Sequence, residues 1–309
     1  MDLHRLVAPP APERGSALAE LARIVERFSP IDGEHRTAIE PLTFHRYSAP
    51  SAGEYTFSKV ALIFAAQGAK QITAGDQSYR YDTAHCLVVS IDLPIVGRVI
   101  EASRERPYLC FALELDIALA TDLVVSRDLP PPDAAPAGPG ISAGALPPAL
   151  LDAACRLARL LDTPRDIPTL APLIQQEIIY RVLTSSQGAR LRDALVADSR
   201  TSRIGRAVEW VKAHYAAPLR LDVLASHVNM SVSSLHRHFK DSTSLSPLQY
   251  QKRLRLFEAR RRLMQGATDL GVVAAAVGYD SLSQFHREYK RLFGAPPMQD
   301  AVRLRTERR

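Results

Sequence analysis

The chain has 309 residues, of which 46% are hydrophobic, so it is long enough for about two domains with buried cores and is not a disordered chain. The net charge of +6 is uneven: residues 201–309 hold 19 Lys and Arg against 9 Asp and Glu, which indicates a polyanionic partner. The three cysteines include no C-x-x-C pair, no run could span a bilayer and no signal-peptide core is present, so we expect a cytoplasmic protein without a membrane segment.

The first 200 residues predict a mixed α and β domain. Apolar residues at helical spacing predict a helix over residues 16–28, which ends before Pro30. From about residue 30 to 116, short β-rich runs separated by turn signals are typical of a small antiparallel barrel or sandwich. Residues 126–148 contain seven prolines and predict a loop.

Two further helices are predicted after this loop, over residues 147–162 and 170–186. The second helix carries a wide apolar stripe. This stripe consists of Leu173, Ile174, Ile178, Ile179, Val182 and Leu183. Packing within the domain and packing against a second copy of the chain both explain it at this stage.

From about residue 203 the pattern is helical throughout, and it contains a helix-turn-helix. Leu224, Ala225 and Val228 lie on one face of a first short helix. Ser231 is a good N-cap for a second helix, in which Leu235 and Phe239 face the first. The outward face of the second helix then carries polar donors suited to a DNA major groove. These donors are Ser233, His236, Arg237 and Lys240.

A second copy of this pattern follows fifty residues later. The hexamer LHRHFK, which starts at Leu235, is matched by FHREYK, which starts at Phe285. In this copy Phe285 and Tyr289 face inward. The outward residues are Ser283, Gln284, His286, Arg287 and Lys290. Two histidines at positions i and i+2, such as His236 and His238, point apart on a helix, so no metal site is expected there.

A helix predicted over residues 247–264 connects the two copies. Ser246 is its N-cap and Pro247 its first residue, and 18 residues at 1.5 Å each give a length of about 27 Å. This length is close to the ~34 Å between successive major-groove faces of a duplex. Arginines on and near this helix are expected to neutralise phosphates. They are Arg253, Arg255, Arg260, Arg261 and Arg262.

The last 107 residues resemble the DNA-binding domain of the AraC/XylS family of bacterial transcription regulators. The resemblance rests on LASHVNMSVSSLHRHFK, SPLQYQKRLRLFEARRRLM and VGYDSLSQFHREYKRLFGAPP. It implies seven helices and two recognition helices in adjacent major grooves of double-stranded DNA. The implied base-facing residues are Ser233, His236, Arg237, Ser283, Gln284, His286 and Arg287, and the implied phosphate contacts are Lys240, Arg253, Lys290 and Arg291. Ser233 stands where some members carry a large aromatic residue, so base preference does not transfer.

The first 200 residues resemble the N-terminal domain of one AraC-type subfamily, on GEHRTAIEPLTFHRYSAP, the run from Ile63 to Ser103, and PLIQQEIIYRVLTSSQGARLR. The resemblance implies an α+β multidomain chain. A cupin-like β-barrel with flanking helices over residues 1–200 would sense a small-molecule effector and form a homodimer, and residues 201–309 would bind DNA and, in an activator, contact RNA polymerase. Residues on strand-like runs are candidates for the effector pocket. They are His45, Tyr47, Tyr79, His85, Cys86 and Tyr108.

Two enzymatic alternatives receive little support. A metal-dependent cupin enzyme needs closely spaced histidines, and the N-terminal half has no H-x-H pair. A methyl-transfer DNA-repair protein would need four clustered cysteines, whereas this chain has three scattered ones. We therefore expect no catalytic residue, metal or cofactor. Redox sensing by Cys86 or Cys110 is disfavoured because both lie on strand-like runs, where thiols are usually buried and inert.

Overall fold

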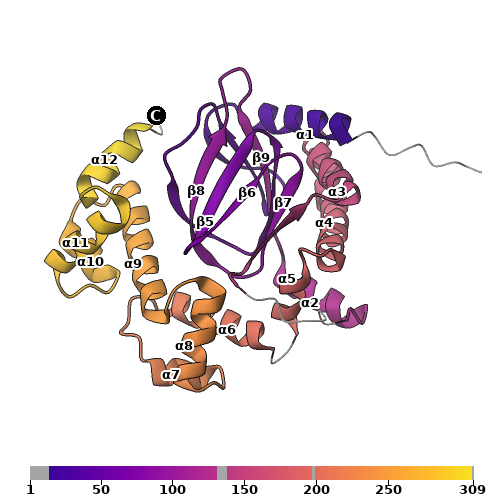
Figure 1. The fold of residues 1–309 in the computed structure, drawn as a ribbon. Coiled ribbons are helices and arrows are strands. Elements are labelled where there is room, and N and C mark those ends of the chain that lie inside the picture. Colours follow the sequence, from indigo (N-terminus) through magenta and orange to yellow (C-terminus); the bar gives the residue numbers. More distant parts are fainter. Residues whose placement is uncertain (1–13, 131–137, 197–198, 308–309) are drawn as a thin grey trace, which may run out of the picture.

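The computed structural model describes residues 14–130, 138–196 and 199–307, and Figure 1 shows a sheet domain followed by a helical domain. The sheet domain contains two antiparallel sheets. One has the order β1 (Gly33–Arg36), β2 (Leu42–Tyr47), β9 (Tyr108–Glu114), β4 (Ala61–Gln67), β7 (His85–Val89) and β10 (Ile141–Ala145). The other has the order β3 (Glu54–Ser58), β8 (Leu93–Glu101), β5 (Ala69–Ala74) and β6 (Gln77–Tyr81).

Alternation along the strands gives the six-stranded sheet two buried faces. On β4, Leu62 and Phe64 belong to a core shared with helices, whereas Ala65 belongs to a core shared with the four-stranded sheet. Successive side chains of a strand point to opposite faces of the sheet. Both faces of the six-stranded sheet are apolar because helices cover one face and the four-stranded sheet covers the other. The four-stranded sheet contributes Ile72 and Val99 to the inter-sheet core.

The expected closed barrel is corrected to two sheets. The strands described form two separate hydrogen-bonded sets, with β1 and β10 at the edges of one and β3 and β6 at the edges of the other. Closure requires a continuous ring of paired strands. Both neighbours of the long strand β8 belong to its own small sheet, so the pairing does not continue into the larger one.

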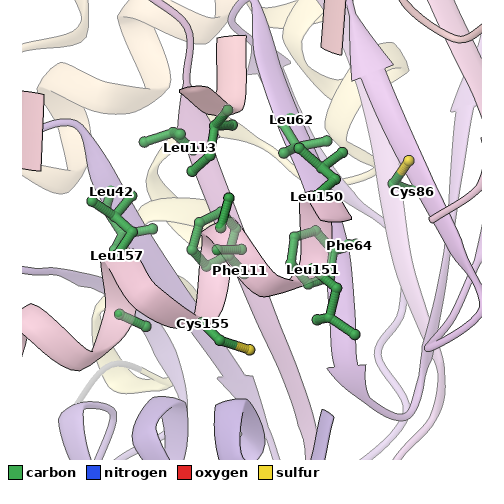
Figure 2. Close-up of a cluster of buried hydrophobic side chains, with 14 of the residues drawn as sticks. Leu42, Leu62, Phe64, Cys86, Phe111, Leu113, Leu150, Leu151, Cys155 and Leu157 are labelled. Atoms are coloured by element: carbon green, nitrogen blue, oxygen red, sulfur yellow. The ribbon is translucent and has the colours of Figure 1, made fainter. Parts of the chain in front are cut away.

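Helices cover the outer face of the six-stranded sheet. They are α1 (Arg14–Phe28), α2 (Ile117–Ser126), α3 (Pro148–Arg159), α4 (Ile167–Thr184) and α5 (Ala189–Leu195). Figure 2 shows the contact, in which Leu150, Leu151 and Leu157 of α3 lie among strand residues such as Phe64 and Phe111. Stacked rings 5.0 Å apart join Phe64 to Phe111 at the centre of this core.

The predicted N-terminal helices are present, with shifted ends. The helix expected over residues 147–162 is α3 followed by a 3₁₀ turn at Leu160–Asp162, and the helix expected from residue 170 begins at Ile167. The loop expected over residues 126–148 contains β10, while its residues 131–137 lie outside those described. The sequence of β10, ISAGA, has little strand character, and its pairing with β7 makes it a strand.

The helical domain contains seven helices among residues 199–307, as the resemblance implies. They are α6 (Arg200–Ala213), α7 (Leu221–His227), α8 (Val232–Thr243), α9 (Pro247–Met264), α10 (Leu270–Ala276), α11 (Leu282–Phe293) and α12 (Pro297–Glu307). Leu235 and Phe239 of α8, and Phe285 and Tyr289 of α11, are fully buried. The two predicted helix-turn-helices, α7–α8 and α10–α11, are therefore confirmed.

The helical domain lies against the outer face of the four-stranded sheet through α9, which contacts β8 and lies beside it in Figure 1. The ring of Phe57 on β3 makes edge contacts with Tyr250 and Phe257 of α9, at 5.5 and 4.8 Å between centroids. The Tyr250 hydroxyl donates to the Asp92 carbonyl oxygen at 2.9 Å, and the Lys212 ammonium group lies 2.6 Å from the Asp92 carboxylate. Apolar and polar contacts thus hold the two domains together.

Candidate nucleic-acid interface

The first recognition helix, α8, presents a polar face to solvent. The Ser231 hydroxyl accepts a hydrogen bond from the backbone N–H of Ser234 and fixes the start of the helix. The predicted contacts Ser233, His236 and Arg237 are all exposed. Lys240, one turn further along, is exposed as well. The apolar side of the same helix is buried, so this polar face is the only one free to meet another molecule among the described residues of α8.

His238 lies apart from this face. Its side chain is 11% exposed and lies 3.6 Å from the Asp241 carboxylate. Burial, and then the charges of Arg200 and Arg237, lower its pKa. The structure therefore separates His238 from His236, as the helical spacing predicted.

The second recognition helix, α11, repeats the face of α8 with one change. Ser283, Arg287 and Lys290 are exposed, and Ser281 caps the helix through the backbone N–H of Gln284. His286 is half-buried. Gln284 is also half-buried, and its amide donates to the Glu288 carboxylate at 3.2 Å. A base contact through this amide nitrogen would therefore have to compete with that hydrogen bond.

The two recognition helices match residue for residue at an offset of fifty. The caps Ser231 and Ser281 correspond, and both recognition helices end on a left-handed residue, Ser244 or Gly294. The exposed pairs at this offset combine a hydroxyl, a guanidinium group and an ammonium group. These pairs are Ser233 with Ser283, Arg237 with Arg287 and Lys240 with Lys290.

Most arginines of α9 make hydrogen bonds or ion pairs within the helical domain. Fewer of them are therefore available to contact phosphates than the sequence predicted. Arg255 donates to the carbonyl oxygens of Tyr215 at 2.7 Å and Gly278 at 2.6 Å. Arg260 lies 2.8 Å from the buried carboxylate of Asp300. Arg261 and Arg262 both pair with Glu258. The partners of Arg255 and Arg260 lie in other segments of the chain, so helical spacing could not predict them, whereas Glu258 lies three and four residues before Arg261 and Arg262 on the same helix and could have been found from that spacing.

Arg253 and Arg291 lie at the contact between the domains. Both line a cavity whose other wall is the four-stranded sheet. Arg253 is half-buried there, and Arg291 is exposed. Their predicted role as phosphate contacts therefore depends on how the helical domain meets the sheet.

Three of the six predicted pocket residues meet between the two sheets. His45 and Tyr47 of β2 pair in register with Cys110 and Tyr108 of β9, and the Tyr108 hydroxyl lies 2.8 Å from that of Tyr81. Burial lowers the pKa of His45 to about 3, so this imidazole is neutral in the folded chain at physiological pH.

Lys70 completes this inter-sheet cluster and was missed from the sequence. Its ammonium group lies 5.6 Å from the ring centroid of Tyr47 and 5.9 Å from that of Tyr108. Lys70 points to the same face of β5 as the buried residues Ile72 and Ala74, because side chains alternate along a strand. This alternation could have predicted the position of Lys70 from the sequence.

The other three predicted pocket residues lie elsewhere. His85 is exposed and lies 2.8 Å from the Asp82 carboxylate. The Cys86 side chain faces the helices rather than the second sheet, because it belongs to the core that α3 covers. Tyr79 donates to the Gln77 side-chain oxygen at 2.6 Å on the edge strand β6. The structure therefore does not bring these residues to the inter-sheet cluster.

The thiols are all buried. Burial raises the pKa of Cys86 and of Cys155 to about 11 and also raises the pKa of Cys110. A thiol of raised pKa holds little thiolate at neutral pH and reacts slowly. No group of three metal-binding side chains occurs among the residues described, and no described helix is long and apolar enough to cross a membrane.

Two helix-turn-helices with exposed cationic faces, joined to a separate sheet domain, define a DNA-binding regulator. The profile of the AraC-type transcriptional regulator N-terminus matches residues 38–190, and a helix-turn-helix domain profile matches residues 224–301. The chain belongs to the AraC-type transcriptional regulators, a non-enzymatic family of DNA-binding proteins.

Curated relatives include HTH-type transcriptional activators named RhaS. RhaS of Pectobacterium carotovorum subsp. carotovorum is 32% identical over 88 residues, which are 28% of this chain and 32% of that protein. RhaS of Escherichia coli K12 is 28% identical over 133 residues, which are 43% of this chain and 46% of that protein. The chain thus matches less than half the length of these relatives.

Solved structures of ToxT from Vibrio cholerae share the fold. ToxT of strain O395 bound to (E)-4-(8-methylnaphthalen-1-yl)but-3-enoic acid has a TM-score of 0.58 at 10% identity, covering 84% of this chain and 97% of ToxT. Unsaturated fatty acid-bound ToxT of strain SCE256 has a TM-score of 0.55 at 12% identity, covering 84% and 94%. The likeness extends over both domains.

Proposed function

We propose that residues 201–309 read a specific duplex through α8 and α11 in successive major grooves, and that an effector bound by residues 1–200 modulates this binding. The observation that carries the proposal is the fifty-residue match between the exposed faces of the two helices. Ser233, His236, Arg237, Ser283, Gln284, His286 and Arg287 are the proposed base contacts. Lys240, Arg253, Lys290 and Arg291 are the proposed phosphate contacts.

Alanine substitution of Arg237 or Arg287 tests the base contacts. Each guanidinium group lies on an exposed face and can donate two hydrogen bonds to guanine, so each loss should cost ~1–3 kcal/mol on a duplex selected from random sequence by the purified chain. Each should also relax one base position. Fluorescence anisotropy of labelled duplexes over a salt series measures both effects.

Arg104→Ala is the matched control, because Arg104 is an exposed arginine on the loop between β8 and β9 of the sheet domain. It should leave DNA affinity unchanged. Equal binding of the native chain to selected and scrambled duplexes, or an affinity that does not fall with salt, would contradict the proposal.

The effector site is the inter-sheet cluster of His45, Tyr47, Tyr108 and Lys70. Neutral rings and one ammonium group beside a largely apolar core suit a small molecule with an acidic group and an apolar body. The carboxylic acids in the two ToxT structures support an acidic effector.

Lys70→Met should weaken the binding of (E)-4-(8-methylnaphthalen-1-yl)but-3-enoic acid, because methionine keeps the apolar stem and removes the cation. A charge-assisted hydrogen bond is worth about 1.5–3 kcal/mol, so a loss of at least roughly tenfold is expected by calorimetry. Lys59→Met, at an exposed lysine paired with Glu114, is the control. Unchanged affinity in Lys70→Met would show that the acid does not bind at this site.

The functional unit is a homodimer that contacts RNA polymerase when it activates. The activators among the relatives support the contact with RNA polymerase. Transcription by purified polymerase from a promoter that carries the selected duplex measures this contact. An exposed apolar stripe on α4 supports the homodimer. Its members are Leu170, Leu173 and Tyr180.

A further inference from the structure

The second recognition helix carries a carboxylate that other side chains surround. Glu288 of α11 has a side chain that is only 12% exposed. Its two oxygens accept hydrogen bonds from the Lys252 ammonium group of α9 at 2.8 Å, from the Tyr279 hydroxyl at 2.8 Å and from the Gln284 side-chain amide at 3.2 Å. These donors belong to different segments of the helical domain, so Glu288 is held from several sides.

The ionisation of Glu288 determines which atom of the Gln284 amide faces it. Burial alone would raise the pKa of Glu288, but hydrogen bonds from Lys252, Tyr279 and Gln284 outweigh it and hold the pKa below its usual range. Glu288 is therefore a carboxylate at neutral pH and can only accept hydrogen bonds. An amide meets such a group with its nitrogen, so the oxygen of the Gln284 side chain is directed away from Glu288.

Gln284 lies where a recognition helix meets bases. It is in the first turn of α11, beside the exposed Ser283 and one turn before the exposed Arg287. Residues near the start of a recognition helix are those that contact base edges. Within the described parts of the chain, the bond to Glu288 is the one hydrogen bond that the Gln284 side chain makes. Its oxygen is therefore free to accept from a base.

The first recognition helix has a different arrangement at the equivalent positions. At the offset of fifty, Ser234 corresponds to Gln284 and His238 corresponds to Glu288. His238 lies beside the Asp241 carboxylate, at 3.6 Å. The two recognition helices therefore differ in chemistry here, although their exposed serine, arginine and lysine residues match.

We propose that Glu288 is a positioning residue for base recognition, which turns the Gln284 oxygen toward an exocyclic amino group of adenine or cytosine. In the major groove these amino groups are donors, whereas guanine and thymine present an acceptor oxygen. An unheld glutamine amide could rotate by half a turn and present its nitrogen to such an oxygen, and Glu288 prevents that rotation. The inference rests on the proposed function, because it requires α11 to lie in the groove.

Fluorescence anisotropy with the purified full chain tests the contact on duplexes that lack single amino groups. The parent is the duplex that the chain selects from random sequence, and purine in place of an adenine, or 2-pyrimidinone in place of a cytosine, removes only the amino group. At one position this removal should weaken binding of the native chain by roughly fivefold, the usual effect of one hydrogen bond. It should leave the affinity of Gln284→Ser unchanged, because this variant lacks the amide oxygen. Equal losses in both proteins at every position would overturn the proposal.

Glu288→Gln tests the positioning. The variant keeps the shape of the side chain, but its amide can donate as well as accept, so the Gln284 amide is no longer held in one orientation. The roughly fivefold cost of removing the amino group should fall below about twofold. Base preference at the position that Arg287 reads should stay the same. A loss of affinity spread evenly over all positions would show that Glu288 only stabilises the fold, and it would overturn the proposal.

Glu209→Gln is the matched control, because it removes one charge from an exposed glutamate of the same domain that pairs with Lys212. It should keep the full cost of amino-group removal, and thermal unfolding confirms that both variants fold. Should Glu288→Gln fail to fold, Glu288→Asp keeps the negative charge beside Lys252 but is one methylene shorter and loses the contact with Gln284. It should reduce the cost in the same way. A folded Glu288 variant that keeps the full cost would overturn the proposal.

Failure of this inference and failure of the proposed function give different results. A native chain that binds selected and scrambled duplexes equally removes the proposed function and this inference with it. A native chain that selects a duplex, while Gln284→Ser or Glu288→Gln keeps the full cost of amino-group removal, overturns only this inference and leaves α8 and α11 as the proposed recognition helices.

Discussion

At the scale of single residues, the helical domain is organised around a buried charge. The Asp300 carboxylate is fully buried and receives Arg260 at 2.8 Å, Arg303 at 2.8 Å and the Tyr289 hydroxyl at 2.9 Å. Burial alone would raise the pKa of Asp300, but hydrogen bonds from Arg260 and Arg303 outweigh it and hold the pKa below its usual range. Asp300 therefore ties α12 to α9 and α11.

Asp300→Asn should destabilise the folded chain by about 3–5 kcal/mol, because it leaves the Arg260 guanidinium group buried without its counter-ion. The control is Asp162→Asn at the exposed pair of Asp162 with Arg27, which should leave the unfolding midpoint nearly unchanged. Urea unfolding followed by circular dichroism measures both. A change in Asp300→Asn no larger than in the control would show that the buried pair does not stabilise the domain.

The Asp300 carboxylate also determines how the stability of the folded chain changes with pH. Because the pKa of Asp300 is lower in the folded than in the unfolded chain, its stabilisation is present above the unfolded value near ~3.9 and is lost as pH falls through the lower folded value. The difference in stability between the native chain and Asp300→Asn should therefore shrink under acid, and a difference that stays constant down to pH 2 would contradict this account.

At the scale of elements, local signals predicted some segments well and others poorly. The helix over residues 247–264 coincides with α9, because Ser246 and Gln249 form a capping box and Pro247 occupies the first turn. Strand β10 was missed because only its pairing with β7 makes it a strand. The prediction of a closed barrel was wrong for a related reason, because closure depends on pairing between strands that are far apart in the sequence.

The candidate site shows the same division. The exposed faces of α8 and α11 follow from helical periodicity once the apolar side of each helix is known, so Arg237 and Arg287 could be placed from the sequence. The surroundings of Arg253 and Lys70 could not be placed in this way, because they depend on how the helical domain meets the sheet domain and how the two sheets face one another.

At the scale of the whole molecule, the apolar stripe predicted on the helix after the proline-rich segment divides into two parts. Ile178, Ile179, Val182 and Leu183 are buried within the sheet domain. Leu173 remains 60% exposed, and Leu170 and Tyr180 lie near it around the helix. Packing within the domain thus explains most of the stripe, and the exposed remainder is the proposed dimer contact.

Leu173→Glu should shift the proposed homodimer to a monomer, because a charge at the centre of an apolar contact loses its hydration on association. Val125→Glu, at a 76% exposed valine on α2, should leave the association unchanged. Sedimentation velocity over a range of concentrations measures the distribution. A monomeric native chain, or a dimer that tolerates Leu173→Glu, would remove this contact from the proposal.

The burial of every native thiol has a practical consequence. Because Cys86, Cys110 and Cys155 lie in cores and hold their protons at neutral pH, a cysteine introduced on the surface would be the one group that a maleimide modifies quickly. One dye on the exposed face of α8 and another on the loop between β8 and β9 would then report the distance between the helical domain and the sheet domain in single molecules, without removal of any native cysteine.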